Sequence, residues 1–377
     1  MLKSRLCIAF FAFAVGCAPA QKPLTDYVNP MLGTATLWDS VDLGFKPTKR
    51  TWGAEVFPGS SLPNAMVQVS PVTKFHSGAG YQYEDSVIYG FTHTNKGHWN
   101  LCHIPLLPVT GTPTPGDYCS PFSHERESAA PGYYQVFLDR YGVDAQLSST
   151  LRCAFHKYTY PAGAAPAVLA DLQRSNEHVR AWDIRKEGDN VFAGWQQTGE
   201  KMYFYAVANR PVTGIEPVVE GDREVRIVRF GEGDGALELR IGFSFVSEKN
   251  ARENLEAEML GKSFAEVRSE ATATWNDLLG RIRVEGGTER EKGLFYSSLY
   301  RSFLWPALRS DVNGEFTDVD GKVINPGFRY YTGPSYWDDY RNKLILLGML
   351  APDVAADVIS SDVDKGEKRG GFMPTFF

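Results

Sequence analysis

The chain changes its hydrophobic pattern near residue 250, and this change restricts its possible folds more than any other feature. Before that point, short runs such as AMVQVS, YYQVFL, MYFYAVA and LELRIGFSFV combine β-branched and aromatic residues, and several alternate apolar with polar positions. Gly, Pro, Asn and Asp punctuate these runs, as turns between strands do. The pattern predicts an antiparallel β-sandwich over residues 22–250.

After residue 250, apolar residues recur three to five positions apart, which indicates amphipathic helices. The first such stripe consists of Leu255, Met259, Phe264, Val267, Ala271, Trp275, Leu278 and Ile282. Capping-box patterns at 288–291 and 335–338 predict the starts of two more helices. We therefore predict helices beginning near 251, 288 and 335, with a linker helix region over 251–287 and a helical domain over 288–377. The final RGGFMPTFF resembles a loop that leads into another element, so we expect this helical domain to be incomplete.

The first twenty residues have the features of a targeting segment. Lys3 and Arg5 precede an apolar run over 6–15 that is too short to span a bilayer. Ala18-Pro19-Ala20 resembles a signal-peptidase site, whereas the residues before Cys17 resemble a bacterial lipobox that would leave this cysteine lipidated. Both alternatives predict export, to the periplasm or the cell surface of a bacterium. No later stretch is long and apolar enough to predict a transmembrane helix.

Charge and cysteine content narrow the class of protein. Lys and Arg total 39 and Asp and Glu total 45, for a net charge of −6, and there is no basic block, so we expect no nucleic-acid partner. Cys102, Cys119 and Cys153 lack metal-type spacing, and both a disulfide among them and free thiols remain open. Aromatic residues make up 13% of the chain, which suits either sugar binding or the cores of β-rich domains.

Three segments, taken together and in order, carry a resemblance to a known family. They are YVNPMLGT with EVFPGSSLPNAMVQVSPVT (55–73), GYQYEDSVIYGFTHTNKGHWNLCHIPLLPVTG (80–111), and LYRSFLWPALRSDVNGEF with YYTGPSYWDDYR (299–341). The set resembles glycoside hydrolase family 92, whose members are typically calcium-dependent, inverting exo-α-mannosidases. The resemblance covers nearly the whole mature chain and implies a β-sandwich followed by the start of an (α/α)6 barrel.

The resemblance implies an exo-acting α-mannosidase, of the α-1,2 type, that releases mannose from glycans by Ca²⁺-assisted inverting hydrolysis. Such hydrolysis needs an acid and a base whose carboxyl groups lie roughly 6.5–9.5 Å apart, and Ca²⁺ prefers oxygen ligands. In this family the acid, the base and most Ca²⁺ ligands follow the Trp-Asp helix, and none of them maps onto this chain. We therefore assign no catalytic and no metal-binding residue here. The alternative is a non-catalytic carbohydrate-binding protein.

Trp337 and Asp338 match the Trp-Asp pair that, in this family, helps to hold the terminal mannose. A carboxylate at Asp338 can accept hydrogen bonds from two sugar hydroxyls, and Trp337 offers an apolar wall. The competing interpretation makes Asp338 the helix-cap partner of Ser335 and places Trp337 in the core. Asp339 is a weaker candidate, expected to be solvated or paired with Arg341.

A second set of candidates comes from a loop that the family places at the active-site mouth. His93, His98 and Trp99 lie there, in the sequence HTNKGHWN, which departs from the family's more common THLSGTGCP and leaves linkage specificity open. Alternative interpretations are a zinc pair formed by the two histidines or ordinary loop histidines. Glu55, in EVFPGSSLP, either reaches the leaving sugar or is a surface carboxylate, and Gly59 is expected to allow a tight bend.

Two short segments resemble the start of a calcium-binding loop. DVNGEF (311–316) and DVDGKV (318–323) have the right first residues, but neither continues to a Glu at the required distance. Their Asn-Gly and Asp-Gly pairs instead favour hairpin turns.

Overall fold

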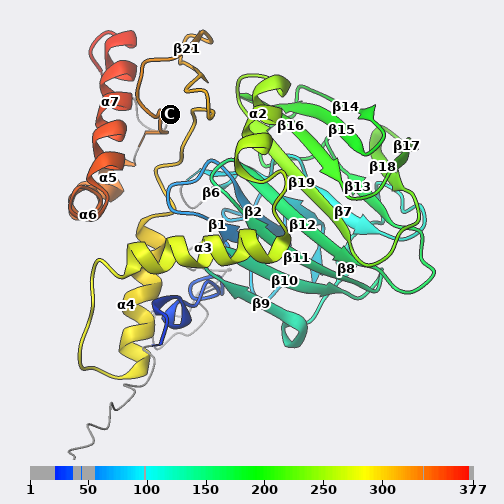
Figure 1. Ribbon diagram of the computed structural model, residues 1–377, viewed down its shortest axis with the longest axis horizontal. Coiled ribbons are helices and arrows are strands. Elements are labelled where there is room, and N and C mark those ends of the chain that lie inside the picture. The colour runs from blue at the N-terminus through cyan, green and yellow to red at the C-terminus, as the bar shows by residue number, and fades with distance from the viewer. Residues whose placement is uncertain (1–21, 37–43, 45–55, 97–98, 334, 373–377) are drawn as a thin grey trace, which may run out of the picture.

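The computed structural model describes residues 22–36, 44, 56–96, 99–333 and 335–372. The expected leader with Cys17, and the candidates Glu55 and His98, lie outside these described residues. The strands before residue 248 form one body, and the helices after residue 288, with one short strand pair between them, lie along one side of it (Figure 1).

Two large sheets make up the strand-rich body, and their described pairings are antiparallel. The first sheet has the order β1 (Ser60–Ser61), β2 (Gln68–Val72), β4 (Gly90–Thr92), β7 (Leu106–Val109), β13 (Ala167–Ala170), β18 (Arg223–Phe230) and β17 (Val212–Glu220). The second has the order β14 (Ala181–Gly188), β15 (Val191–Gln197), β16 (Lys201–Ala208), β19 (Leu237–Ser244), β12 (Cys153–Thr159), β11 (Val143–Ser149), β10 (Tyr133–Leu138) and β9 (Glu127–Ala130).

The alternating sequence of the strands explains why the two sheets pack together. In β16 every second side chain is buried, namely Met202, Phe204, Ala206 and Ala208, because successive residues of a strand point to opposite faces. These side chains share one core with residues of the other sheet such as Leu107 and Ile227. The interior strand β13 is buried throughout and reads AVLA. The predicted antiparallel β-sandwich is confirmed.

Small two-stranded sheets and turns accompany the two large sheets. β3 (Val87–Ile88) pairs with β8 (Ser120–Pro121), β5 (Asn95–Lys96) with β6 (Trp99–Asn100), and β20 (Phe316–Thr317) with β21 (Val323–Ile324). The turn predicted at DVDGKV is confirmed, because it joins β20 to β21 with Gly321 at φ 77°. DVNGEF also turns, since the Gly314 N–H donates to the Asp311 carbonyl oxygen at 2.9 Å. The three described cysteines are free thiols.

Gly59 is needed for a reason other than the expected bend. A Cβ at this position would lie 2.1 Å from the carbonyl oxygen of Val69 in the neighbouring strand, so only glycine permits this close approach of two backbones. The φ angle of Gly59 is not positive, so the backbone conformation itself does not require glycine.

The helical region has more breaks than its sequence pattern predicts. The stripe expected as one helix from 251 is divided into α2 (Glu248–Glu258) and α3 (Phe264–Leu279), because Gly261 takes a φ of 95° between them. Ser263 and Glu266 then form the capping box that starts α3. The capping box predicted at Thr288 is confirmed as the start of α4 (Glu289–Ser302).

The third predicted helix is also divided. A four-residue helix, α5 (Tyr336–Asp339), is followed by α6 (Lys343–Leu350), and the non-helical φ of −147° at Asn342 separates them. A further helix, α7 (Pro352–Lys368), begins with proline at its first position and was not predicted. Two short 3-10 helices, η1 (Leu24–Tyr27) and η2 (His124–Arg126), are also present.

The helices are anchored to the sandwich by buried contacts. On α3, Trp275 is fully buried; its Nε1–H donates to the Ser61 carbonyl oxygen of β1 at 2.8 Å, and its ring centroid lies 4.4 Å from that of Tyr300 on α4. On the other side, α2 packs Leu255 and Met259 against Phe155 of the second sheet. Within the part of the chain that the structure describes, no helix is both long and apolar enough to cross a bilayer.

Candidate functional site

Helix α5, which carries the predicted site residues Trp337 and Asp338, follows the segment 304–332. We call the contact between this segment and the sandwich the junction. Just before α5, Thr332 donates its N–H to the Ala307 carbonyl oxygen at 2.9 Å, and its hydroxyl accepts from the Ala307 N–H at the same distance. Trp337 and Asp338 occupy the second and third positions of α5. Their side chains lie outside what the structure describes, so their role in sugar binding stays a prediction.

The neighbouring carboxylate at Asp339 is not solvated, nor paired with Arg341 as expected. It is 6% exposed, accepts a hydrogen bond from the Ser335 N–H at 3.0 Å, and forms an ion pair with Lys343 at 3.3 Å. The backbone N–H of Ser335, directly before α5, is thus bonded to the Asp339 carboxylate. The alternative in the sequence analysis had made Asp338 the capping partner of Ser335.

Helix α7 holds α5 from the other side through a buried polar group that the sequence analysis missed. The Tyr336 hydroxyl donates to Asp362 Oδ2 at 2.5 Å, and the other oxygen of that carboxylate lies 3.3 Å from Lys365 Nζ. Lys365 also donates to the Tyr331 carbonyl oxygen at 2.7 Å. Burial lowers the pKa of Lys365 to about 8. An Asp and a Lys three residues apart on one helix were the available sequence signal.

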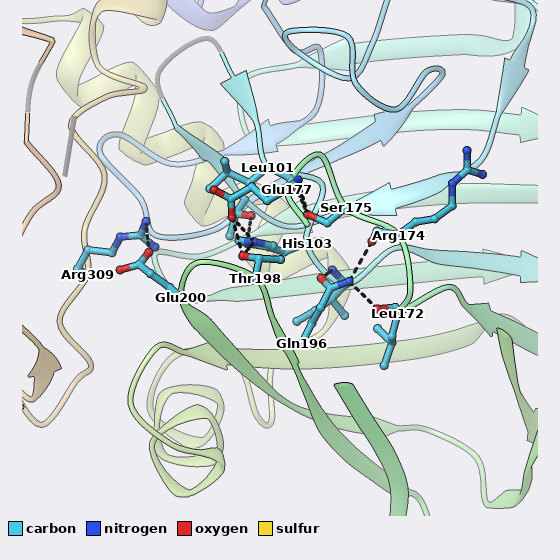
Figure 2. Close-up of polar contacts among 12 residues, drawn as sticks. Leu101, His103, Leu172, Arg174, Ser175, Glu177, Gln196, Thr198, Glu200 and Arg309 are labelled. Atoms are coloured by element: carbon cyan, nitrogen blue, oxygen red, sulfur yellow. Dashed lines mark hydrogen bonds and ion pairs between the residues drawn. The ribbon is translucent and has the colours of Figure 1, made fainter. Parts of the chain in front are cut away.

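The segment before α5 is tied to the sandwich by side chains that cap its backbone. Gln68 Nε2 donates to the Leu304 carbonyl oxygen at 2.7 Å, and Asn64 Nδ2 donates to that of Pro306 at 2.8 Å. Arg309 then forms an ion pair with Glu200 at 3.1 Å, at the turn between β15 and β16 (Figure 2). Because these groups are paired across the junction, the segment that leads to α5 has a defined position on the sandwich.

His93 lies at the same junction but is enclosed in the sandwich. Its carbonyl oxygen accepts from the Gln68 N–H, and its fully buried ring places Nε2 3.0 Å from Nε2 of His156. His156 Nδ1 in turn lies 2.6 Å from the Tyr158 hydroxyl. Burial lowers the pKa of His93 to about 3, so the ring is neutral at pH 7. A direct contact of this ring with a sugar stays a prediction, and it would require a path to solvent.

The β5–β6 hairpin, which contains Trp99, is fixed at its base by a second histidine. His103 Nδ1 lies 2.8 Å from the Thr94 hydroxyl, and its Nε2 lies 3.0 Å from the Thr198 hydroxyl, which donates to Glu177 Oε2 at 2.5 Å. Figure 2 shows His103, Thr198 and Glu177 turned toward one another. The side chain of Trp99 lies outside what the structure describes, so its contact with sugar also stays a prediction.

The loop over 172–180 covers the hairpin base and borders an open cavity. The Ser175 hydroxyl donates to the Leu101 carbonyl oxygen at 2.6 Å, and Gln196 Nε2 donates to the Leu172 and Arg174 carbonyl oxygens, each at 2.9 Å (Figure 2). The cavity has a volume of about 760 Å³. Its lining includes Arg174, Glu177, His178, Arg180 and Trp182.

No cluster of His, Cys, Asp and Glu side chains marks a metal site among the residues that the structure describes. Among them, no group of three or more His, Cys, Asp or Glu side chains could hold a metal ion. The Ca²⁺ that the family resemblance implies stays a prediction, because Ca²⁺ is also bound by backbone and amide carbonyl oxygens. The zinc pair considered for His93 and His98 cannot be judged from these residues, because His98 lies outside them.

Comparisons with known proteins agree with the order of the two regions. The description "Glycosyl hydrolase family 92 N-terminal domain" matches residues 27–253, and "Glycosyl hydrolase family 92 catalytic domain" matches residues 250–377. The two matches meet inside α2.

Solved structures and one curated relative are similar over most of this chain. The family GH92 α-mannosidase BT3965 of Bacteroides thetaiotaomicron is 26% identical, with a TM-score of 0.85, over 94% of this chain and 51% of that chain. The family GH92 inverting mannosidase BT2199 of the same species is 26% identical, with a TM-score of 0.80, over 93% and 49%. An uncharacterized secreted glycosidase of Arthroderma benhamiae is 25% identical over 77% of this chain and 42% of its own length. The chain thus spans about half the length of these relatives or less.

Proposed function

The chain belongs to glycosyl hydrolase family 92, and on this premise we propose that it supplies the substrate-binding part of an exo-acting α-mannosidase. The substrate class is mannose-containing glycans, with an α-1,2 linkage as the first candidate. The observation that carries the proposal is the similarity, over nearly the whole chain, to a family GH92 α-mannosidase that has also been solved in complex with mannoimidazole.

In this proposal α5 presents Trp337 and Asp338 to the terminal mannose. Asp338 accepts hydrogen bonds from two neighbouring hydroxyls, and Trp337 packs on the C–H face of the ring. The hydrogen bond from Tyr336 to Asp362 supports this role, because it fixes α5 on α7 and so limits the entropy that is lost when sugar binds. The proposal also assigns sugar contacts to Trp99 and His98, in the segment that precedes His103, and to Glu55.

The bond-breaking groups are not assigned to this chain. Inverting hydrolysis places an acid on the leaving oxygen and a base on a water at the opposite face, and no residue here matches the family's acid or base. In the complete family enzyme Ca²⁺ would take hydroxyl oxygens of the mannose as ligands. Since no residue here matches the family's Ca²⁺ ligands, we derive no step of the reaction through the ion.

Export is part of the same proposal. The basic and apolar leader predicts a mature chain that begins at a lipidated Cys17 or near Gln21, in the periplasm or on the cell surface. The secreted relative supports export but not lipidation. Intact-mass analysis of the exported protein distinguishes a diacylated cysteine from a free N-terminus, and recovery of only the uncleaved chain in the cytoplasm would refute both.

A rate measurement on two proteins tests the proposed activity. The 377-residue chain alone should hydrolyse aryl α-mannosides at close to the background rate, because it lacks an assigned acid and base. A version extended by the second half of a family 92 catalytic domain should hydrolyse them, lose activity with a calcium chelator, and lose most of it on Asp338→Ala. If the extended protein binds mannosides but does not hydrolyse them, the alternative of a non-catalytic carbohydrate-binding protein is favoured instead.

A further inference from the structure

The open cavity of about 760 Å³ beside the hairpin base carries an arginine whose charge is not balanced. Arg174 and Arg180 line it together with one carboxylate, Glu177. That carboxylate is already engaged, because its Oε2 accepts from the Thr198 hydroxyl at 2.5 Å and lies 3.5 Å from His103 Nε2 (Figure 2). Within the described part of the chain, the Arg180 side chain has no hydrogen bond and no ion pair. The cavity therefore favours an anion, although the whole chain has a net charge of −6.

The acidic groups next to the cavity do not supply the missing counter-ion, because each has an arginine of β18. Asp171 forms an ion pair with Arg223 at 2.6 Å, and Glu224 forms one with Arg226 at 2.7 Å. Both pairs lie near the cavity, since Gln173 in its lining accepts a hydrogen bond from the Glu224 N–H at 2.8 Å. The Asp171 carboxylate also attracts Arg174, which leaves Arg180 as the cavity arginine without a described counter-ion.

The walls of the cavity are fixed by contacts within the protein. The Arg174 guanidinium lies 4.2 Å from the centroid of the Phe75 ring, and its Nη1 donates to the Tyr118 hydroxyl at 3.2 Å. His76, also in the lining, takes a φ of 60°, in the left-handed region that non-glycine residues rarely adopt, and it donates its N–H to Asn176 Oδ1 at 2.6 Å. Groups that are already held in place lose little entropy when a ligand binds.

The same lining offers contacts for a sugar ring beside the charge. The indole of Trp182 is partly exposed in the cavity, and an aromatic face packs well on the C–H face of a pyranose. The exposed imidazoles of His76 and His178 can form hydrogen bonds with hydroxyl groups. The cavity thus combines a guanidinium, an apolar wall and neutral polar groups.

We propose that this cavity binds an acidic sugar, whose carboxylate, sulfate or phosphate oxygens are held by Arg180 and Arg174. A guanidinium donates two parallel N–H bonds to such an oxyanion, which gives both affinity and orientation. The inference goes beyond the proposed function, because it uses none of the residues assigned to mannose. That the anion is carried by a sugar rests on membership of family 92, and not on hydrolysis by this chain.

Isothermal titration calorimetry of the 377-residue chain tests this site with four probes: methyl β-D-glucuronide, glucose 6-phosphate, glucose and inorganic phosphate. We expect an acidic sugar to bind about tenfold more tightly than glucose, which is the scale of one hydrogen bond to a charged group, and to bind more weakly as NaCl is added. The tighter of the two acidic sugars identifies a carboxylate or a phosphate ester as the anion.

Two arginine variants locate the binding. Arg180→Gln should remove the preference for the acidic sugar over glucose. Arg290→Gln is the matched control and should keep it, because Arg290 is also exposed and has no described partner but lies on α4. Circular dichroism should show the wild-type unfolding temperature for both variants, since each replaces an exposed side chain.

Any of three results would overturn the proposal. Acidic sugars that bind no more tightly than glucose would show that the cavity does not select an anion. Binding that Arg180→Gln leaves unchanged would place the anion elsewhere. Inorganic phosphate that binds as tightly as glucose 6-phosphate, without binding of the glucuronide, would show an anion site that does not recognise sugar. If mannoside binding fails while the acidic sugar still binds through Arg180, the proposed function is refuted and this site is supported.

Discussion

Replacing Trp275 tests how strongly the helical region depends on the sandwich. The side chain is fully buried between α3, α4 and β1, and it makes both a ring contact with Tyr300 and a hydrogen bond to Ser61. Removing a buried Trp to Ala costs about 3–5 kcal/mol, and the unpaired Ser61 carbonyl adds about 1–3 kcal/mol. We therefore expect Trp275→Ala to lower the free energy of unfolding by at least about 4 kcal/mol.

Urea denaturation followed by far-UV circular dichroism measures this loss. Trp275→Phe should lose only about 1–3 kcal/mol, because it keeps a buried ring but leaves the Ser61 carbonyl unpaired. Leu294→Ala on α4 is the control and should change stability by less than about 0.5 kcal/mol, because Leu294 is exposed. A loss of less than about 1 kcal/mol for Trp275→Ala would refute the packing of α3 on the sandwich.

Three further perturbations address the core, the sheet and α5. Acidification from about pH 6.5 toward 3 should destabilise the protein, because burial holds the pKa of His93 at about 3 and that of His156 well below its usual value, so that the unfolded chain binds protons first. The free energy of unfolding should fall with a slope that approaches about 1.4 kcal/mol per pH unit for each ring. A free energy of urea unfolding that stays constant between about pH 6.5 and 5 would contradict this prediction. Gly242→Ala should lower stability by about 1–3 kcal/mol in thermal unfolding, since its Cβ would lie 2.1 Å from a backbone oxygen of α2, whereas Gly199→Ala, with nothing within 4 Å, should be nearly neutral. Tyr336→Phe, which removes the hydrogen bond from α5 to α7, should weaken mannoside binding severalfold in an NMR titration with little change in unfolding temperature, and unchanged binding would count against a positioning role.

The sequence was sufficient for the β-then-α architecture because strand alternation and helical spacing are direct consequences of burial. The sequence pattern did not predict where one helix ends and the next begins, because those breaks depend on local backbone conformation. The apolar stripe from Leu255 to Ile282 continues through Gly261, so the break between α2 and α3 depends on a backbone conformation that the spacing does not record. Helix α7 was not predicted as a separate element, although Val358 on it is buried and Val354 and Ala355 pack against the same core.

The sequence identified candidate residues for the site, but it did not predict which groups these residues contact. Two adjacent aspartates, Asp338 and Asp339, are equally able to cap α5, and only the fold assigns the Ser335 N–H to Asp339. The groups that hold α5, Asp362 and Lys365, come from a helix that the sequence analysis did not identify. His93 looked like a loop residue, yet strands from both sheets enclose it, because its burial depends on pairing with distant His156.

Selective binding of mannose by the chain as it stands is the most direct test of the account. Saturation-transfer NMR compares methyl α-D-mannopyranoside with methyl α-D-glucopyranoside, which differs only at the 2-hydroxyl, for the wild-type chain and for Asp338→Ala. We predict that the mannoside binds with a dissociation constant on the order of millimolar, because a few sugar hydrogen bonds at about 1 kcal/mol each act in competition with water. The glucoside should bind more weakly, and Asp338→Ala should abolish the difference. Equal binding of both sugars, or mannoside binding that Asp338→Ala leaves unchanged, would contradict the assignment of this chain as the part of a family 92 mannosidase that holds the terminal mannose.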